Sequence, residues 1–256
     1  MTVTSVPRGP ARWITIDNPD TRNALTVADR SDLSAALREA DGDPDAAVIV
    51  LTGEGGQFCS GGDIREFDRE RTTLEASRYA SEIAQPVFVA LRESHTPTIA
   101  RVKGVAAGAG MYLALGCDIV IAESTARFVP AHLELAAPPD WGALWLMPRL
   151  IGVARAKKYL LTSQPIGAGQ AADWGLIAEA VPAADLDHTV QTYCERIARF
   201  DPSVVSITRR GLDRSLDQSL SSFLEWEALA IAATLQRPEH RNQVKAFLRQ
   251  RSEEFT

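Results

Sequence analysis

Two glycine-rich segments hold the residues most suited to chemistry. Gly53–Asp63 and Gly104–Gly110 each follow an apolar run and precede a helical pattern. A turn that leads from a strand into a helix leaves backbone N–H groups free at the end of the helix where peptide dipoles favour negative charge. Two such turns side by side can form an oxyanion hole, where losing one donor typically costs about 3 kcal/mol of transition-state stabilisation. One loop alone would indicate only a tight turn, but the pair favours an anion site.

The common phosphate-binding and nucleophile motifs are absent from these loops. Gly108–Leu113 lacks the third glycine of a dinucleotide fingerprint, and Gly56–Gly62 lacks the Lys-Ser/Thr pair of a P-loop. Phe58 occupies the position where a nucleophile elbow requires glycine. The histidines show no metal-ligand spacing; they are His95, His132, His188 and His240. We therefore expect neither a metal nor a separate cofactor.

The composition limits the partners and the compartment. The net charge is −6 and no block of five basic residues occurs, which argues against nucleic-acid binding. Three widely spaced cysteines among 256 residues predict no disulfide framework. The first ten residues show no signal pattern, and no apolar run reaches membrane-spanning length. We expect a cytoplasmic protein without a membrane partner.

Strands, loops and helices alternate along the first part of the chain and predict an α/β fold. Alternation predicts a strand over 13–16, and a continuous apolar run predicts one over 47–52. Further strands are expected over 98–102 and 117–121. Helices are expected over 26–40, capped by Thr26, over 74–92, with a kink at Pro86, and over 109–115. Later helical patterns cover 154–161, 168–174, 186–199, 203–216, 223–235 and 243–250, with one extended segment at 177–181. We expect a core of residues 1–197 and a helical region, 198–256, for oligomerisation and pocket closure.

Both glycine loops resemble those of one enzyme superfamily. Phe58–Ile64 is similar to the first oxyanion loop of the crotonase (enoyl-CoA hydratase/isomerase) superfamily, and Lys103–Gly110 is similar to the second. Segments 18–26, 148–152 and 171–177 match further signatures in order, so the resemblance covers nearly the whole chain. It implies a spiral of ββα repeats with a C-terminal helical region, assembled as a homotrimer or a dimer of trimers.

The resemblance also implies the substrate and its contacts. The substrate would be an acyl-CoA thioester, with coenzyme A present only as part of it. The oxyanion donors would be the amides of Gly62 and Ala109, which would hold the thioester oxygen as an enolate forms. The implied substrate contacts are Arg22, Ala24, Phe58, Ser60, Asp63, Ile64, Tyr112 and Trp141.

The residues at the acid/base positions favour isomerisation over hydration. The two glutamates of the family's hydratases correspond to Tyr112 and His132 here. Glu134 is near, but on a helix it would point about 200° away from His132. Pro138–Gly142 resembles the Pro-Asp loop of the family's single-aspartate isomerases. That resemblance implies that Asp140 moves a proton between two carbons and converts a 3-enoyl-CoA into a 2-enoyl-CoA.

Asp140 must be a stronger base than a free aspartate, whose pKa is about 3.9. Burial raises a carboxyl pKa, so we expect apolar side chains to dry its surroundings; the candidates are Met111, Leu133, Trp141 and Trp145. The competing interpretation is that Asp140 caps the following helix, which would lower its pKa instead.

Other reactions remain open. His132 is either a packed side chain or a group that relays protons or activates water, which would make the protein a hydratase-like lyase or an acyl-CoA hydrolase. Halide displacement by Asp140 ranks third, because no histidine lies between Arg65 and Ser94. A non-catalytic protein that binds acyl-CoA is the remaining alternative.

Overall fold

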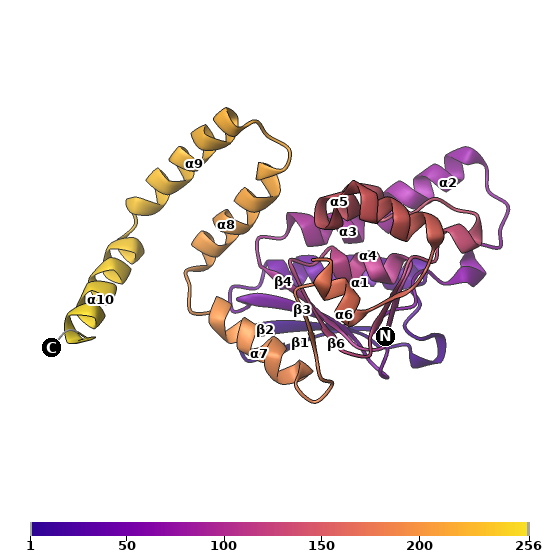
Figure 1. Ribbon diagram of the computed structural model, residues 1–256, viewed down its shortest axis with the longest axis horizontal. Coiled ribbons are helices and arrows are strands. Elements are labelled where there is room, and N and C mark those ends of the chain that lie inside the picture. The colour runs from indigo at the N-terminus through magenta and orange to yellow at the C-terminus, as the bar shows by residue number, and fades with distance from the viewer. Residues whose placement is uncertain (1, 255–256) are drawn as a thin grey trace. The chain divides into compact units, whose positions relative to one another are not determined.

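A computed structural model describes residues 2–254 (Figure 1). The chain separates into two compact units, Met1–Ile197 and Ala198–Thr256. The first unit is α/β, and the second is made of helices. No helix within the described residues is both long enough and apolar enough to traverse a membrane.

The first unit is built on a six-stranded sheet. Its strand order is β1 (Val3–Arg8), β2 (Ala11–Ile16), β3 (Val48–Gly53), β4 (Thr98–Val102), β6 (Ile119–Glu123) and β9 (Glu179–Val181). Strand β1 runs antiparallel to β2, and all other neighbours are parallel. Every residue of β3 and β4 is buried. For β3 this agrees with the continuous apolar run that predicted a strand covered on both faces.

The predicted strand at 117–121 begins later than expected. The Asp118 carboxylate accepts hydrogen bonds from the amide of Thr98, at 2.7 Å, and from its hydroxyl, at 2.9 Å. This side-chain link holds Asp118 at the start of β4, so regular pairing begins only at Ile119. A second sheet contains the short strands β5 (Val105–Ala107), β7 (Arg127–Val129) and β8 (Ile166–Gly167).

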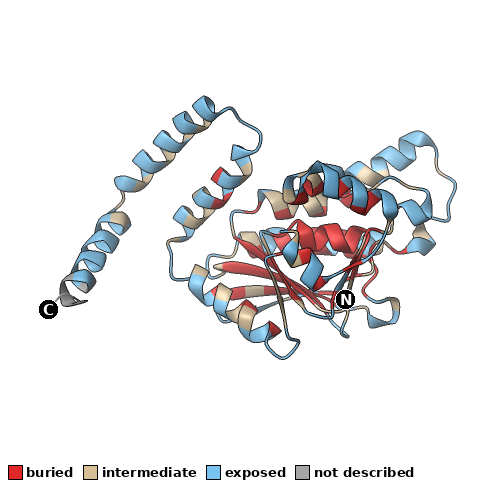
Figure 2. Ribbon diagram, viewed as in Figure 1, coloured by how far each residue is buried: buried red, intermediate tan, exposed pale blue. Residues whose placement is uncertain are grey.

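The helices that border the glycine loops begin where local chemistry predicted. Helix α1 (Val27–Asp41) starts at Thr26, whose side chain forms a reciprocal capping box with Asp29. Helix α4 (Ala109–Leu115) matches its predicted range, and all its residues are buried. Figure 2 shows this burial continuing through the strands of the main sheet.

The predicted helix at 74–92 is a helical run in three parts. They are α2 (Thr73–Tyr79), a π-helical turn (Ala80–Ala84) and α3 (Gln85–Glu93). Pro86 has no N–H to donate, and the π turn ends two residues before it, at Ala84. Helix α5 (Ala143–Thr162) consists of two helical segments joined by a kink at Gly152, where φ is 76°. The segment after the kink covers the predicted helix at 154–161.

The remaining helices are α6 (Ala168–Asp173) and α7 (Leu186–Ile197) in the first unit, and α8 (Pro202–Ser215), α9 (Leu220–Leu235) and α10 (Pro238–Glu254) in the second. No residue of α9 is buried within the described chain. Leu229 on this helix is 73% exposed. The surface of the second unit therefore includes exposed apolar side chains.

Candidate active site

The two glycine loops are joined by backbone hydrogen bonds. The Cys59 amide donates to the Val105 carbonyl at 3.1 Å, and the Ala107 amide donates to the Cys59 carbonyl at 2.9 Å. The first loop thus runs as an extra extended segment beside β5. Helix α4 approaches Cys59 so closely that a Cβ on Gly110 would lie 2.4 Å from the Cys59 carbonyl oxygen. Only glycine fits at this contact.

Gly62 is held in place by its neighbours on both sides. The Leu25 amide donates to the Gly61 carbonyl at 2.8 Å, and the Asp63 amide donates to the Leu25 carbonyl at 3.0 Å. A Cβ on Gly61 would be 3.4 Å from the Ala109 amide nitrogen, so the two loops meet at this point. Neither the Gly62 amide nor the Ala109 amide donates a hydrogen bond to any residue between 2 and 254. Two adjacent free amides are what an oxyanion hole requires.

Both amides belong to residues that line one cavity of about 510 Å³. The predicted site residues that line it are Ser60, Gly62, Ile64, Ala109, His132, Asp140 and Trp141. Lining residues that the sequence analysis did not select are Arg30, Gly61, Phe67, Tyr79, Ala84, Gly108, Ala131, Glu134, Leu135, Ala137 and Pro138. Segments from distant parts of the chain therefore converge on a largely apolar space with few charged groups.

Asp140 forms a pair with His132. Nε2 of His132 and Oδ1 of Asp140 are 2.8 Å apart. The His132 side chain is 13% exposed and the Asp140 side chain is 51% exposed. The competing interpretation, in which Asp140 caps the following helix, is excluded because the residue before α5 is Gly142 and no side chain caps this helix. Asp140 is left free to bond with His132 and to face the cavity.

The apolar surroundings predicted for Asp140 are only partly present. Trp141 adopts a left-handed conformation, with φ 53°, and its side chain is buried, whereas Asp140 stays on the exposed loop before it. Leu133, another predicted drying group, is exposed. Gly142 continues the left-handed turn, and a Cβ there would lie 2.4 Å from the Phe88 ring. The backbone reversal thus buries the indole and leaves the carboxylate accessible.

The second nitrogen of His132 has no partner. Nδ1 is buried without a hydrogen bond within the described chain. A buried N–H without an acceptor costs about 1–3 kcal/mol, so we assign the ring proton to Nε2, which then donates to Asp140. In this tautomer Nε2–H is the donor and the Asp140 carboxylate is the acceptor.

Tyr112 lies behind this pair and does not line the cavity. Its ring centroid is 5.4 Å from that of His132, and its hydroxyl is buried without a partner among the described residues. Burial, with a smaller effect of the Asp140 charge, raises the pKa of the Tyr112 phenol. The placement indicates packing and not contact with substrate.

Four other predicted substrate contacts also lie outside the cavity lining. Phe58 is fully buried in the core, so its side chain does not border an open pocket. Asp63 is buried against Arg65, whose hydrogen bond holds the pKa of the Asp63 carboxyl below its usual range. Arg22 is exposed with φ 55°, and Ala24 is buried. Of these four, only Arg22 remains available to a coenzyme phosphate.

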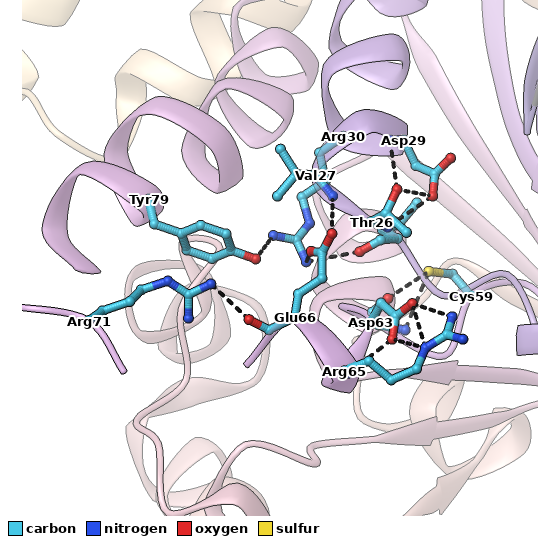
Figure 3. Close-up of polar contacts among 12 residues, drawn as sticks. Thr26, Val27, Asp29, Arg30, Cys59, Asp63, Arg65, Glu66, Arg71 and Tyr79 are labelled. Atoms are coloured by element: carbon cyan, nitrogen blue, oxygen red, sulfur yellow. Dashed lines mark hydrogen bonds and ion pairs between the residues drawn. The ribbon is translucent and has the colours of Figure 1, made fainter. Parts of the chain in front are cut away.

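The cavity wall contains two charged residues, Glu134 and Arg30, that the sequence analysis did not assign to the site. Glu134 was expected to face away from His132, yet both line the cavity, because the chain there forms only a short 3-10 turn, Leu133–Leu135. Arg30 is buried, and it occupies the apolar face of α1, three residues before Leu33. An arginine in that helical pattern was a detectable sign of a buried polar contact. Figure 3 shows its position among the neighbouring polar groups.

Comparison with known proteins agrees with this geometry. The enoyl-CoA hydratase/isomerase family matches residues 11–256. A probable enoyl-CoA hydratase from Rhodobacter capsulatus is 38% identical, covering 95% of this chain and 93% of its own. The 1,2-epoxyphenylacetyl-CoA isomerase of Escherichia coli is 31% identical, covering 95% and 94%. The crystal structure of an enoyl-CoA hydratase from Bacillus anthracis superposes with a TM-score of 0.92 at 26% identity, over 98% of this chain and 97% of that chain.

The fold and the paired loops define a crotonase-type α/β protein. The chain belongs to the enoyl-CoA hydratase/isomerase family and is an acyl-CoA enzyme of that family.

Proposed function

We propose that this enzyme shifts the double bond of a 3-enoyl-CoA to give the 2-enoyl-CoA, with Asp140 as its single acid/base. One observation carries the proposal. Asp140 lines the same cavity of about 510 Å³ as Gly62 and Ala109, whose amides are free within the described chain. A base and an oxyanion site that share one cavity can act on the carbons next to a thioester.

The chemistry follows from this arrangement. The amides of Gly62 and Ala109 donate to the thioester oxygen, which makes the protons on C2 more acidic. Asp140 removes one of these protons, the negative charge spreads over the dienolate, and the protonated Asp140 delivers the proton to C4. His132 donates to the other carboxylate oxygen through Nε2 and fixes its orientation. No water is added and no net charge is gained.

The Asp140 carboxylate, half-exposed in the free enzyme, becomes a stronger base when substrate is bound. An acyl chain that fills the cavity removes water from the exposed side of Asp140. Desolvation raises the pKa of a carboxyl group. The drying that the sequence analysis assigned to neighbouring side chains would then come in part from the substrate itself.

Hydration is the second candidate, and Glu134 is the observation that favours it. Glu134 and Asp140 line the same cavity, so a second carboxylate is available to activate a water molecule. Several relatives carry the name enoyl-CoA hydratase, including the one from Rhodobacter capsulatus. The Escherichia coli relative is named an isomerase.

Product analysis separates these reactions. The enzyme is incubated with a 3-enoyl-CoA and, separately, with a 2-enoyl-CoA, and the products are identified by chromatography and mass. Isomerisation predicts a 2-enoyl-CoA from the first substrate and no 3-hydroxyacyl-CoA from either. Asp140→Asn should lose about 10²–10⁴-fold in rate, whereas Glu134→Gln should stay within about threefold. Rapid hydration that both variants abolish would refute the isomerase proposal.

We also propose that the second unit mediates self-association. The exposed apolar residues of its helices include Leu220, Leu224, Leu229, Ile231 and Phe247. A surface of this kind usually marks an interface. Light scattering after size exclusion should give a trimer or a multiple of three, and a monomer at micromolar concentration would exclude this assembly.

A further inference from the structure

Arg30 places a guanidinium in the wall of the cavity although its side chain is only 2% exposed. Nη1 donates to the Tyr79 hydroxyl, and Nη2 donates to the Leu25 carbonyl at 2.9 Å. Nε has no partner among the described residues. Burying an arginine without full pairing is unfavourable for folding. The unfavourable burial of Arg30 indicates that its position contributes to the site and not to folding stability.

The guanidinium lies directly beside the first oxyanion loop. A Cβ on Gly62 would be 2.7 Å from Nη2 of Arg30. The Leu25 carbonyl that accepts from Nη2 also accepts from the Asp63 amide at 3.0 Å. Arg30 and the Asp63 amide thus donate to the same Leu25 carbonyl. This carbonyl orients the backbone that follows Gly62. Displacing the guanidinium would loosen one of the two amides of the oxyanion site.

The positive charge of Arg30 is only weakly compensated. Glu66 Oε2 is 3.9 Å from Nη2, beyond hydrogen-bonding distance. The other carboxylates near this segment have partners of their own: Asp63 is paired with Arg65, and Asp29 bonds to the Thr26 cap. Figure 3 shows these groups around Arg30.

Arg30 is also the one arginine or lysine among the described residues that line the cavity. Glu66 is a partial countercharge to it at 3.9 Å, and the carboxylates of Glu134 and Asp140 line the same cavity. The Arg71 guanidinium stacks 4.8 Å from the centre of the Tyr79 ring and does not line the cavity.

We infer that Arg30 is a positioning residue of the oxyanion site, which fixes the Gly62 backbone and supplies the positive charge that favours an enolate over a neutral thioester. The inference rests on the proposed oxyanion role of Gly62 and Ala109. Opposite unit charges about 6 Å apart in an effective dielectric of about 20 shift an equilibrium by about 100-fold. Because Glu66 opposes the guanidinium, we expect a net effect of about tenfold.

The test uses acetoacetyl-CoA, a 3-ketoacyl thioester whose enolate absorbs in the near ultraviolet. Saturating the intact enzyme with this ligand at fixed pH gives the enolate fraction of the bound ligand from a difference spectrum. The reading needs no turnover, so it is independent of which reaction the enzyme catalyses. The variants are Arg30→Met, Arg30→Lys and Glu66→Gln, and the control is Arg38→Met, which removes an exposed guanidinium from the same helix.

Opposite changes are expected from the two charges. Arg30→Met should lower the enolisation constant of the bound ligand about tenfold, Arg30→Lys should lower it less, and Arg38→Met should leave it unchanged. Glu66→Gln should raise it about threefold, because the countercharge is lost while an amide oxygen can still accept from the Val27 amide. A purely structural role cannot produce this increase. If Arg30→Met does not fold, Arg30→Lys and Glu66→Gln decide the question.

Two negative results have different meanings. If the wild-type enzyme does not increase the enolate fraction above that of free ligand, the oxyanion site itself fails and the proposed function fails with it. If the wild-type enzyme does increase it, and Arg30→Met matches the wild type or Glu66→Gln lowers the fraction, only the role of Arg30 is overturned.

Discussion

Gly110 offers a sharp test of the contact between the two glycine loops that we propose as the oxyanion site. In Gly110→Ala the new Cβ would lie 2.4 Å from the Cys59 carbonyl oxygen, 2.7 Å from Cys59 Cβ and 2.8 Å from its Sγ. Carbon atoms pack at about 3.5–4.0 Å, so helix α4 and the first loop must separate by about 1 Å. A displacement of this size at a reacting centre typically costs about 100-fold, and the loss of one oxyanion donor costs about 10²–10³-fold.

We therefore expect kcat/KM of Gly110→Ala to fall about 10²–10³-fold. The free energy of unfolding should fall by about 1–3 kcal/mol, the usual cost of overpacking a core. Activity is measured on a 3-enoyl-CoA at a temperature where circular dichroism shows the variant to be fully folded. Gly169→Ala in α6 is the matched control, because a Cβ there has no atom within 4 Å; it should retain activity within about twofold. A folded Gly110→Ala enzyme with wild-type activity would contradict the assignment of the paired loops as the oxyanion site.

Three further predictions concern buried or half-buried groups. Tyr112→Phe removes a buried hydroxyl that has no partner within the described chain, so thermal melting should show equal or higher stability, by up to about 1–2 kcal/mol, with kcat within about twofold. Burial alone would raise the pKa of Asp41, but hydrogen bonds from Thr96, Ser94 and His95 lower it overall. Because the carboxylate is partly exposed and solvent screens it, Asp41→Ala should lose only about 1 kcal/mol at pH 7. That loss should shrink as the pH falls below about 4, because the contribution of a carboxyl with a lowered folded-state pKa disappears on protonation, and denaturant melts at pH 7 and 3 will show whether the two proteins converge. Burial raises the pKa of Cys59 and Cys194 to about 12, so a thiol reagent at pH 8 should label neither in the native protein and both after denaturation.

Much of the fold could be predicted because its signals are local. Thr26 and Asp29 form the capping box of α1 from residues three apart, and an uninterrupted apolar run marks β3 as buried on both faces. The short strands β5, β7 and β8 were not predicted, because a strand of two or three residues is defined by its partners and not by its own sequence. The π turn at Ala80–Ala84 likewise has no simple sequence pattern.

The candidate site was predictable where motifs carry it and unpredictable where packing decides it. The glycine loops and Asp140 fall at motif positions, and the structure brings them to one cavity. The exposure of Asp140 depends on the left-handed turn at Trp141, and its bond to His132 depends on the path of the intervening loop. The contact of Arg30 with the Leu25 carbonyl and the Gly62 loop arises only when separate segments meet. These features follow from tertiary packing, which local patterns do not encode.

The central claim is that one carboxylate serves a thioester enolate held by two backbone amides. Deuterium incorporation from D2O into a 3-enoyl-CoA tests it most directly, because proton removal is then observed without reference to the final product. Exchange of the proton on Asp140 with D2O before delivery places label at C2 and C4 with the wild-type enzyme. The account predicts this labelling, with a rate lower by about 10²–10⁴-fold in Asp140→Asn and thioester affinity within about threefold. Wild-type exchange rates in a folded Asp140→Asn variant would contradict the account and assign the proton transfer to another group.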